Sequence, residues 1–310
     1  MSNNCSLSTV SCQLSYGNVQ ALKNVSFEVE RGELFGLIGP DGAGKTSLFR
    51  ILATLLLADG GTVTVNGLDA VADYKAIRRC TGYMPGRFSL YQDLTVEENL
   101  NFFASVFNVT VKENRYLIED IYRQIAPFGK RRAGQLSGGM KQKLALCCAL
   151  IHKPSVLLLD EPTTGVDPVS RKEFWEMLKR LKHQGITILV STPYMNEASM
   201  CDRIALMQNG EILSIDTPAK TVANYPRKLY AAESDRIYRT LVQLRENPAV
   251  RSVYSFGASL HVTFNDQSTG EDGLSTVENE INCRLKEISP TVEDCFIEMS
   301  NRYPQTGDEK

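Results

Sequence analysis

A glycine-rich segment that contains a lysine and two hydroxyl residues follows a short apolar stretch early in the chain. Its residues are Gly39, Pro40, Asp41, Gly42, Ala43, Gly44, Lys45, Thr46 and Ser47. Glycines let backbone N–H groups close around phosphate oxygens, and the start of a helix favours an anion through its dipole. Lys45 is therefore expected to contact the β- and γ-phosphates of ATP, and the hydroxyl of Thr46 is expected to hold Mg²⁺.

Two adjacent acids at the end of an apolar run form the second candidate element. The run Val156–Leu159 predicts a buried strand, and Asp160 and Glu161 follow it directly. An aspartate in this place can hold Mg²⁺ through water, and Glu161 is placed to polarise the attacking water as the catalytic residue. Such a pair can also merely cap the next helix, so it supports nucleotide chemistry only together with the phosphate-binding segment.

A third segment, Leu136-Ser137-Gly138-Gly139-Met140, begins a predicted helix and lies shortly before the acidic strand. A serine followed by two glycines forms a second helix start suited to an anion. One chain would then carry two phosphate-binding ends, although a single nucleotide rarely needs both from the same chain. This combination resembles the ABC ATPase family, whose signature motif is Leu-Ser-Gly-Gly-Gln; Met140 stands in place of the glutamine.

The resemblance covers about residues 5 to 220 and implies a head-to-tail dimer. ATP would lie between Lys45 of one subunit and Ser137, Gly138 and Gly139 of the other. Tyr16 occupies the position where the family stacks an aromatic ring on adenine, although it can also be a buried strand tyrosine. Asp167 matches the loop that crosses the dimer; it can equally be only a helix N-cap, and both roles are compatible.

Two positions depart from the family pattern. Gly86 stands where the family has a glutamine that senses Mg²⁺, and Pro193 stands where the family has a histidine that contacts the γ-phosphate. Proline has neither an N–H group nor an imidazole. These changes motivate a second hypothesis, in which the chain is a largely non-hydrolytic partner in a heterodimeric transporter. Glu161 argues against it, and Gln92 is a weaker candidate to replace the lost glutamine.

The segment Pro290–Ile297 resembles the end of ATP-binding subunits of ABC-2-type exporters, such as daunorubicin-type drug efflux systems. The implied function is ATP hydrolysis that powers a membrane-spanning permease, for export of a drug or small molecule. The implied partners are permease subunits and a second ATP-binding subunit, identical or different. We expect the permease to dock near Arg87, Phe88 and Tyr91.

Composition limits the other classes of protein. Hydrophobic residues make up 43% of the chain, enough for a sizeable core, and the formal net charge is −2. A basic field that would attract nucleic acid is therefore not expected, and DNA-repair or translation ABC proteins are a remote third class. The apolar stretch Ile51–Ala58 is far shorter than a membrane span requires, and the first residues do not resemble a signal peptide. We expect a cytoplasmic protein that associates peripherally with the inner face of the cell membrane through the permease.

The predicted elements alternate between strands and helices, which indicates an α/β fold with a parallel sheet. We expect an ABC ATPase domain at residues 1–220, with an antiparallel β part and a helical insert at about 88–152. A small α+β accessory domain, with a β-α-β-β-α pattern, is expected at 221–310. The specific local predictions are a helix that includes Leu48, Ile51, Leu52 and Leu55, a capping box of Thr95 and Glu98, a helix start at Asp167-Pro168, and a hairpin turn at Asn209-Gly210. His152 and His183 are expected on helix surfaces, and the eight cysteines are expected to be buried free thiols.

Overall fold

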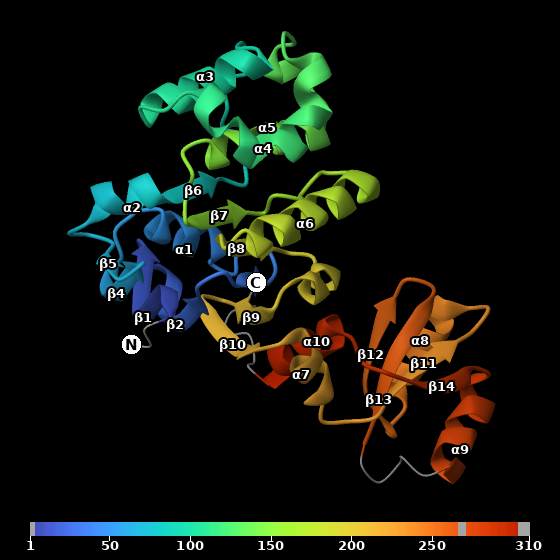
Figure 1. Cartoon of the computed structure of the whole chain (residues 1–310). Coiled ribbons are helices and arrows are strands. Elements are labelled where there is room, and N and C mark those ends of the chain that lie inside the picture. Colours follow the sequence, from blue (N-terminus) through green and yellow to red (C-terminus); the bar gives the residue numbers. More distant parts are fainter. Residues whose placement is uncertain (1–3, 266–270, 303–310) are drawn as a thin grey trace. The chain divides into compact units, whose positions relative to one another are not determined.

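The computed structural model describes residues 4–265 and 271–302. The chain divides into two compact units, of which the second is Lys220–Glu298. The first unit contains the described residues before Lys220 together with residues 299–302. Figure 1 shows both units, with their elements labelled.

A six-stranded sheet forms the centre of the first unit. Its strand order is β10-β9-β3-β8-β7-β6, and all neighbours pair in parallel except β9 and β10. The strands are β3 (Leu34–Ile38), β6 (Thr81–Met84), β7 (Val156–Asp160), β8 (Thr187–Thr192), β9 (Arg203–Gln208) and β10 (Glu211–Asp216). Every residue of β3, β7 and β8 is buried, as is typical of parallel strands covered on both faces.

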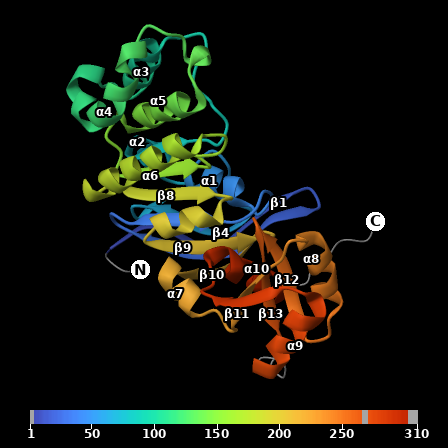
Figure 2. The ribbon, with the colours of Figure 1, turned by 90° about the vertical axis from the view of Figure 1, so that its right-hand side faces the viewer.

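A second, antiparallel sheet packs on the first through a shared apolar core. Its strands are β1 (Cys5–Tyr16), β2 (Val19–Glu30), β4 (Gly60–Val65) and β5 (Leu68–Asp69), in the order β2-β1-β4-β5. Helix α1 (Lys45–Leu52) contributes Leu48, Phe49, Ile51 and Leu52 to this core. Helix α6 (Pro168–His183) contacts β3 and β8. Figure 2 shows these layers from the side.

A group of helices follows β6 and the short helix α2 (Tyr74–Cys80). It consists of α3 (Val96–Val106), α4 (Val111–Ile125) and α5 (Gly138–Leu150), with 3-10 turns at Ala126–Phe128 and Ala133–Gln135. The predicted capping box is confirmed, because the Thr95 hydroxyl accepts the N–H of Glu98 and the Glu98 carboxylate accepts that of Thr95. The expected α/β core with an antiparallel part and a helical insert is thus present.

The second unit contains a four-stranded antiparallel sheet in the order β12-β13-β11-β14. Its elements are β11 (Leu229–Glu233), α8 (Ile237–Glu246), β12 (Val250–Phe256), β13 (Ser259–Phe264), α9 (Glu271–Ile281) and β14 (Arg284–Ile288), between α7 (Pro218–Ala223) and α10 (Val292–Arg302). This order of elements is the split β-α-β arrangement of ferredoxin-like folds. The sequence pattern did not reveal α9 and β14, because β14 is a charged edge strand with no buried residue.

The predicted hairpin turn is confirmed, because Asn209 and Gly210 both have positive φ, 49° and 78°, as a two-residue hairpin turn requires. The cysteine prediction is confirmed in part: all eight are free thiols, but Cys5, Cys80 and Cys283 are only partly buried. One local prediction is wrong. Leu55 does not belong to α1, because the helix ends at Leu52 and Thr54 turns away with φ 60°. The Leu55 side chain is 56% exposed beyond the helix end.

The prediction for His152 is also wrong, whereas His183 is exposed as expected. The His152 ring stacks on Phe107 at a centroid distance of 3.7 Å, and its Nε2 donates to the Thr81 carbonyl at 3.2 Å. Burial lowers the pKa of the imidazole below its usual value, because the charged form loses hydration. The apolar neighbours of His152 come from distant segments, so its local sequence could not show this contact.

The lowered pKa predicts an acid-dependent loss of stability. Because the unfolded histidine binds a proton near pH 6.5 and the folded one binds it only at lower pH, stability is full above pH 6.5 and falls as the pH decreases below it. We expect His152→Phe, which keeps the stacking, to reduce the difference in melting temperature between pH 7 and pH 5. His183→Gln is the control and should leave that difference unchanged. An unchanged difference in His152→Phe would contradict the assignment.

Candidate nucleotide site

The phosphate-binding segment lies between β3 and α1, and close packing dictates its glycines. A Cβ atom at position 39 would lie 2.0 Å from the Met207 carbonyl oxygen, and one at position 44 would lie 2.5 Å from that of Ala21. Gly44 also has φ 102°, in the region that favours glycine. The N–H of Gly210, at the tip of the β9–β10 hairpin, donates to the Ala43 carbonyl at 3.0 Å. The backbone of the loop is therefore fixed by contacts with the β9–β10 hairpin and with β2.

Lys45 is the first residue of α1 and is only 3% exposed. Its Nζ donates to the carbonyls of Gly39 and Pro40 at 2.8 and 2.9 Å, and it lies 3.2 Å from Oε1 of Glu161. The loop thus curls around one ammonium group, and its outer residues Pro40, Asp41 and Gly42 remain exposed. This arrangement holds the Lys45 ammonium in a defined position inside the glycine-rich loop.

The residues after Lys45 lie at the start of α1, where a helix favours an anion. Thr46 and Ser47 are half-buried, so their hydroxyls border the exposed part of the loop. The Tyr16 hydroxyl, at the end of β1, lies 3.3 Å from the Ser47 hydroxyl. Tyr16 is 47% exposed, so it is not the buried strand tyrosine that was the alternative, and its ring lies beside the loop.

The two acids end β7 next to the loop because β8 alone separates β7 from β3. Asp160 is 1% exposed, and its Oδ1 accepts a hydrogen bond from the Ser191 hydroxyl at 2.7 Å. The same hydroxyl accepts the N–H of Glu161 at 2.9 Å. Glu161 has φ 49°, and its Oε1 lies 3.2 Å from Nζ of Lys45. Burial, and next the charge of Asp160, raise the pKa of Tyr83 to about 12.

Ser191 is a site residue that the sequence interpretation did not name as such. It pairs with Asp160 across the β7–β8 ladder, and it is fully buried. A hydroxyl at the end of a predicted central strand is the signal that could have identified it, because neighbouring parallel strands end at the same edge. Its two hydrogen bonds fix both acids relative to β8.

The two departures from the family pattern lie close to these acids. A Cβ atom at position 86 would lie 3.2 Å from the Asp160 carbonyl oxygen and 3.7 Å from its Oδ2. A longer side chain at Gly86 would therefore start beside the carboxylate. Pro193 follows the last residue of β8 and is half-buried.

The predicted helix start at Ser137 is present, at the beginning of α5. Ser137 caps α5, its Oγ accepting the N–H of Met140 at 3.4 Å, and Ser137 and Gly138 are exposed. A Cβ atom at Gly139 would lie 2.7 Å from the Ser170 hydroxyl, so this glycine lets α5 approach α6. Among the described residues, no hydrogen bond or ion pair joins Ser137 to the phosphate-binding segment.

Asp167 caps α6, with its Oδ1 accepting the N–H groups of Val169 and Ser170 at 3.1 and 3.0 Å. These bonds, chiefly that from Ser170, lower the pKa of its carboxyl. The N-cap prediction is confirmed, and the side chain remains exposed. The predicted site residues therefore form two groups. Lys45, Asp160 and Glu161 lie together, whereas Ser137 and Asp167 are exposed at the starts of α5 and α6.

Comparison with known proteins agrees with this geometry. The profile of the family described as ABC transporter matches residues 22–164. The chain is 33% identical over 295 residues to the Nod factor export ATP-binding protein I of Rhizobium sp. (strain N33), covering 93% of the chain and 94% of that protein. The chain belongs to the ABC transporter ATP-binding family. It is also 32% identical to the daunorubicin resistance ATP-binding protein DrrA2 of Streptomyces coeruleorubidus, over 95% of each chain.

Other ABC proteins extend the comparison. The chain is 40% identical to the probable multidrug ABC transporter ATP-binding protein YbhF of Escherichia coli (strain K12), over 87% of the chain, but it spans only 47% of that relative. A solved ATP-binding subunit of an ABC transporter is 27% identical, with a TM-score of 0.65 over 71% of this chain and 93% of that one. The dimeric ABC transporter cassette MJ0796 is 26% identical, with a TM-score of 0.62 over 68% and 98%. The predicted ABC ATPase fold is thus confirmed.

The fold also bears on the membrane. Among the helices described for this ABC protein, none is long and apolar enough to cross a bilayer.

Proposed function

We propose that this chain is an ATPase subunit that binds and hydrolyses MgATP to drive a membrane permease, in the direction of export. The observation that carries the proposal is the 3.2 Å contact between Lys45 and Glu161. It brings the phosphate-binding segment and the strand-end acids, which lie more than a hundred residues apart in the sequence, to one point. Such a pairing of a phosphate-binding cation with a candidate base is what hydrolysis of a nucleoside triphosphate requires.

The residues present fit the proposed ligands. Backbone N–H groups of the glycine-rich loop and the Lys45 ammonium would hold the phosphates, and Tyr16 offers an exposed ring for adenine stacking. The Thr46 hydroxyl and the Asp160 carboxylate are hard oxygen donors suited to Mg²⁺. When bound, the metal ion would neutralise charge on the phosphates. Glu161 would accept a hydrogen bond from the attacking water.

A second subunit completes the site in this proposal. Ser137 and Asp167 are exposed, and within the part of the chain that the structure describes no hydrogen bond or ion pair joins them to the phosphate-binding segment. In a head-to-tail dimer, Ser137, Gly138 and Gly139 of one subunit would contact the nucleotide held by Lys45 of the other. The dimeric MJ0796 cassette is a solved structure of similar fold. The proposal applies equally to a second copy of this chain and to a different ATP-binding subunit.

Export is supported by the names of similar proteins, which include Nod factor export and daunorubicin resistance ATP-binding proteins. The tail segment that resembles ABC-2-type exporters begins α10. We therefore place the chain at the cytoplasmic face of the membrane, where a permease would hold it. The transported molecule contacts the permease, so this chain does not define it.

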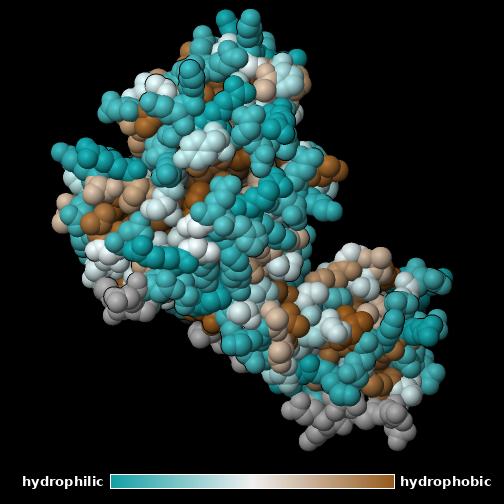
Figure 3. Space-filling view, in the orientation of Figure 1, coloured by the Kyte–Doolittle hydropathy of each residue, from teal (hydrophilic) through white to brown (hydrophobic). Residues whose placement is uncertain are grey.

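The proposed docking surface is an apolar groove beside the helical group. A cavity of about 270 Å³ is lined mainly by apolar side chains, including Met84, Phe88, Phe103 and Phe107. Figure 3 shows apolar surface where the helices α3–α5 meet the rest of the first unit. Tyr91, which follows the lining residue Leu90 in the chain, is 52% exposed and lies edge-on to Phe102 at a centroid distance of 4.8 Å. An apolar segment of the permease is the expected occupant.

This docking surface predicts the effect of two substitutions. Arg87→Ser combined with Tyr91→Ser is expected to disrupt co-purification with the permease, because it removes an exposed cation and an aromatic ring that adjoin lining residues in the chain. ATP affinity should be unchanged, because neither residue contacts the phosphate-binding segment. The matched control is Tyr116→Ser with Arg123→Ser, an exposed pair on α4 that does not line the cavity. Full assembly of the Arg87/Tyr91 variant would contradict the proposed surface.

Hydrolysis itself is tested by the ATPase rate of the purified chain, which Glu161→Gln should abolish. The comparisons give no specific support to the alternative of a largely non-hydrolytic partner. The glutamine and the histidine of the family are nevertheless missing, and their absence predicts slow ATP hydrolysis, because one positioned catalytic group commonly contributes about 10²–10⁴-fold to the rate.

Gly86→Gln combined with Pro193→His restores both side chains and is therefore expected to raise the ATPase rate. Gly86 lies beside Asp160, so the glutamine amide would extend toward the carboxylate that is proposed to hold Mg²⁺. An unchanged ATPase rate would contradict the view that the two missing side chains limit hydrolysis.

A further inference from the structure

A carboxylate is buried just beyond the end of β8. Glu197 belongs to the short 3-10 helix η3 (Met195–Met200) and is 3% exposed. Its oxygens accept the Thr163 hydroxyl at 2.9 and 3.1 Å, and Oε2 also accepts the Thr192 hydroxyl. Nε of Arg171 lies 3.6 Å from Oε1. The carboxylate therefore has three partners, which come from three different segments.

The first segment is the end of β8, which touches the phosphate-binding loop. The Thr192 hydroxyl donates to Glu197, while the Thr192 carbonyl accepts the N–H of Gly39 at 3.3 Å. Pro193 comes next in the chain, and a proline offers no N–H group to hold this position. The Tyr194 N–H donates to the Thr192 hydroxyl at 3.1 Å. The strand end is therefore fixed by its neighbours and not by residue 193.

The other two segments flank the loop between the acids and α6. Thr163 lies between Glu161, the proposed catalytic residue, and Asp167, the residue that caps α6. Arg171 is in the first turns of α6, and its N–H donates to the Asp167 carbonyl at 2.9 Å. The Arg171 guanidinium also lies over the Tyr194 ring at 4.1 Å. Glu197 thus ties the Glu161–Asp167 loop and α6 to the strand end.

Fold stability alone does not account for this carboxylate. A buried charge loses hydration, and replacing a buried ion pair with well-packed apolar groups is often neutral or stabilising. Among the described residues, two partners of Glu197 lie in segments that carry proposed nucleotide-site groups or touch the phosphate-binding loop, and the third, Arg171, lies in the helix that Asp167 caps. We propose that Glu197 is a positioning residue for ATP hydrolysis, which holds the Glu161–Asp167 loop against the end of β8 through Thr163. The proposal rests on the proposed function and assigns the residue that aligns its parts.

The test uses the full-length chain and compares kcat and KM for ATP. Thr163→Val removes one hydroxyl without changing the shape of the side chain, and Glu197→Gln removes the charge. Both are expected to lower kcat at least about tenfold, because small displacements of reacting groups are costly to the rate. KM for ATP should change by no more than about twofold, since Lys45 and its loop remain. Thr163→Ser, which keeps the hydroxyl, should restore the wild-type kcat.

A double-variant measurement identifies the contact itself. If Thr163 and Glu197 act through their shared hydrogen bonds, the Thr163→Val/Glu197→Gln chain should be no slower than the slower single variant. Multiplied losses would mean that the two side chains act separately, and would overturn the proposed link. Thr163→Val also decides the matter if Glu197→Gln does not fold.

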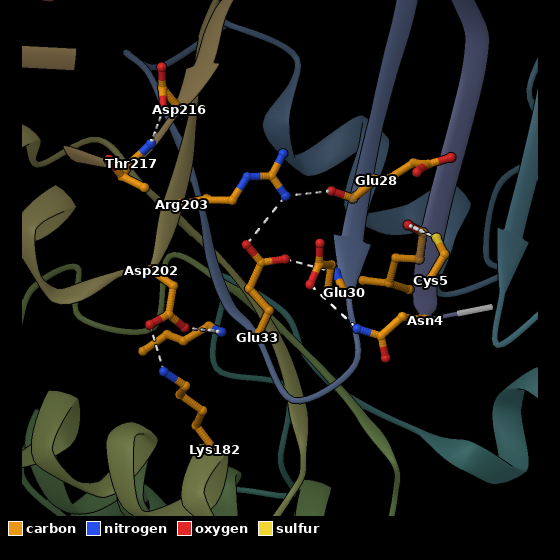
Figure 4. A network of polar contacts seen from close by, with 12 residues as sticks. Asn4, Cys5, Glu28, Glu30, Glu33, Lys182, Asp202, Arg203, Asp216 and Thr217 are labelled. Atoms are coloured by element: carbon orange, nitrogen blue, oxygen red, sulfur yellow. Dashed lines mark hydrogen bonds and ion pairs between the residues drawn. The ribbon is translucent and has the colours of Figure 1, made fainter. Parts of the chain in front are cut away.

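Another buried glutamate of the same unit provides a matched control. Glu33 is 8% exposed and lies 3.4 Å from Nη1 of Arg203. Figure 4 shows Arg203 between Glu33 and the carbonyl of Glu28. Glu33 precedes β3, whereas the phosphate-binding segment follows that strand. Glu33→Gln therefore disturbs a buried ion pair at the far end of the strand and should leave kcat unchanged, whatever its effect on melting temperature.

The outcomes separate the two proposals. A wild-type chain without ATPase activity, alone or with its permease, would contradict the proposed function. An active wild type whose Thr163→Val and Glu197→Gln variants keep kcat would overturn the positioning role alone. Equal losses in Glu197→Gln and Glu33→Gln would also overturn it, because they would reflect folding and not alignment.

Discussion

Replacing Lys45 with methionine is expected to weaken ATP binding by about 10- to 100-fold, the loss that corresponds to a hydrogen-bonded charge. The Lys45 ammonium has a defined position, held by the carbonyls of Gly39 and Pro40. A bound nucleotide would therefore meet a charge that needs little rearrangement. Methionine keeps the buried apolar stem, so the fold of the loop should persist. Equilibrium binding of ATP and a melting curve measure the two effects separately.

The chain offers a close control for Lys45. Lys143 in α5 is also nearly buried, and its Nζ lies 2.6 Å from the Glu173 carboxylate. Lys143→Met should leave ATP affinity unchanged, because this lysine lies outside the phosphate-binding segment. Normal ATP affinity in a folded Lys45→Met chain would contradict the proposed role of the loop.

Ser137→Arg is expected to abolish ATPase activity while the chain alone still binds ATP. Ser137 is exposed at the start of α5, and in residues 4–265 and 271–302 no hydrogen bond or ion pair joins it to its own phosphate-binding segment. An arginine there would block the approach of a second subunit's nucleotide and remove the helix cap. Loss of one preorganised group at a transition state costs about 10²–10³-fold, and the steric block adds to this. ATPase rate and ATP affinity, measured on the same preparation, give the result.

Mixing variants shows whether the two ends act across a dimer. Chains carrying Ser137→Arg and chains carrying Lys45→Met each lack one end, but a mixed dimer contains one site with both ends intact. We therefore expect the mixture to recover activity that neither variant has alone. Thr110→Arg removes another exposed helix cap, that of α4, and should leave the rate unchanged. Loss of ATP affinity in isolated Ser137→Arg would contradict the assignment in trans.

Local chemistry explains why the phosphate-binding segment and both acids could be predicted from the sequence. Gly39 and Gly44 are required by backbone contacts, and an apolar run such as β7 predicts a buried strand in almost any context. Ser191 could not be assigned in this way. Its function depends on β8 lying between β3 and β7, and strand order is a property of the whole chain.

The same limit applies to the contacts that the sequence analysis missed. His152 is paired with Phe107 and Thr81, which lie far from it in the sequence. Strand β14 consists largely of charged, exposed residues, so it has no apolar alternation to reveal it. Leu55 has helical spacing, yet α1 ends before it. Periodicity therefore identified the long buried elements, and it failed where distant segments or a local turn determine the structure.

The β9–β10 hairpin has a consequence for protein engineering. Exposed turns are normally the safest places for an inserted tag or reporter domain. By this rule, the hairpin turn at Asn209-Gly210 would be selected as an insertion point. Here the Gly210 N–H donates to Ala43, and its carbonyl accepts the N–H of Lys23 at 2.8 Å. An insertion at this tip would loosen the phosphate-binding segment itself. The turn at Gly257, where an added Cβ meets no atom within 4 Å, is the better point of attachment.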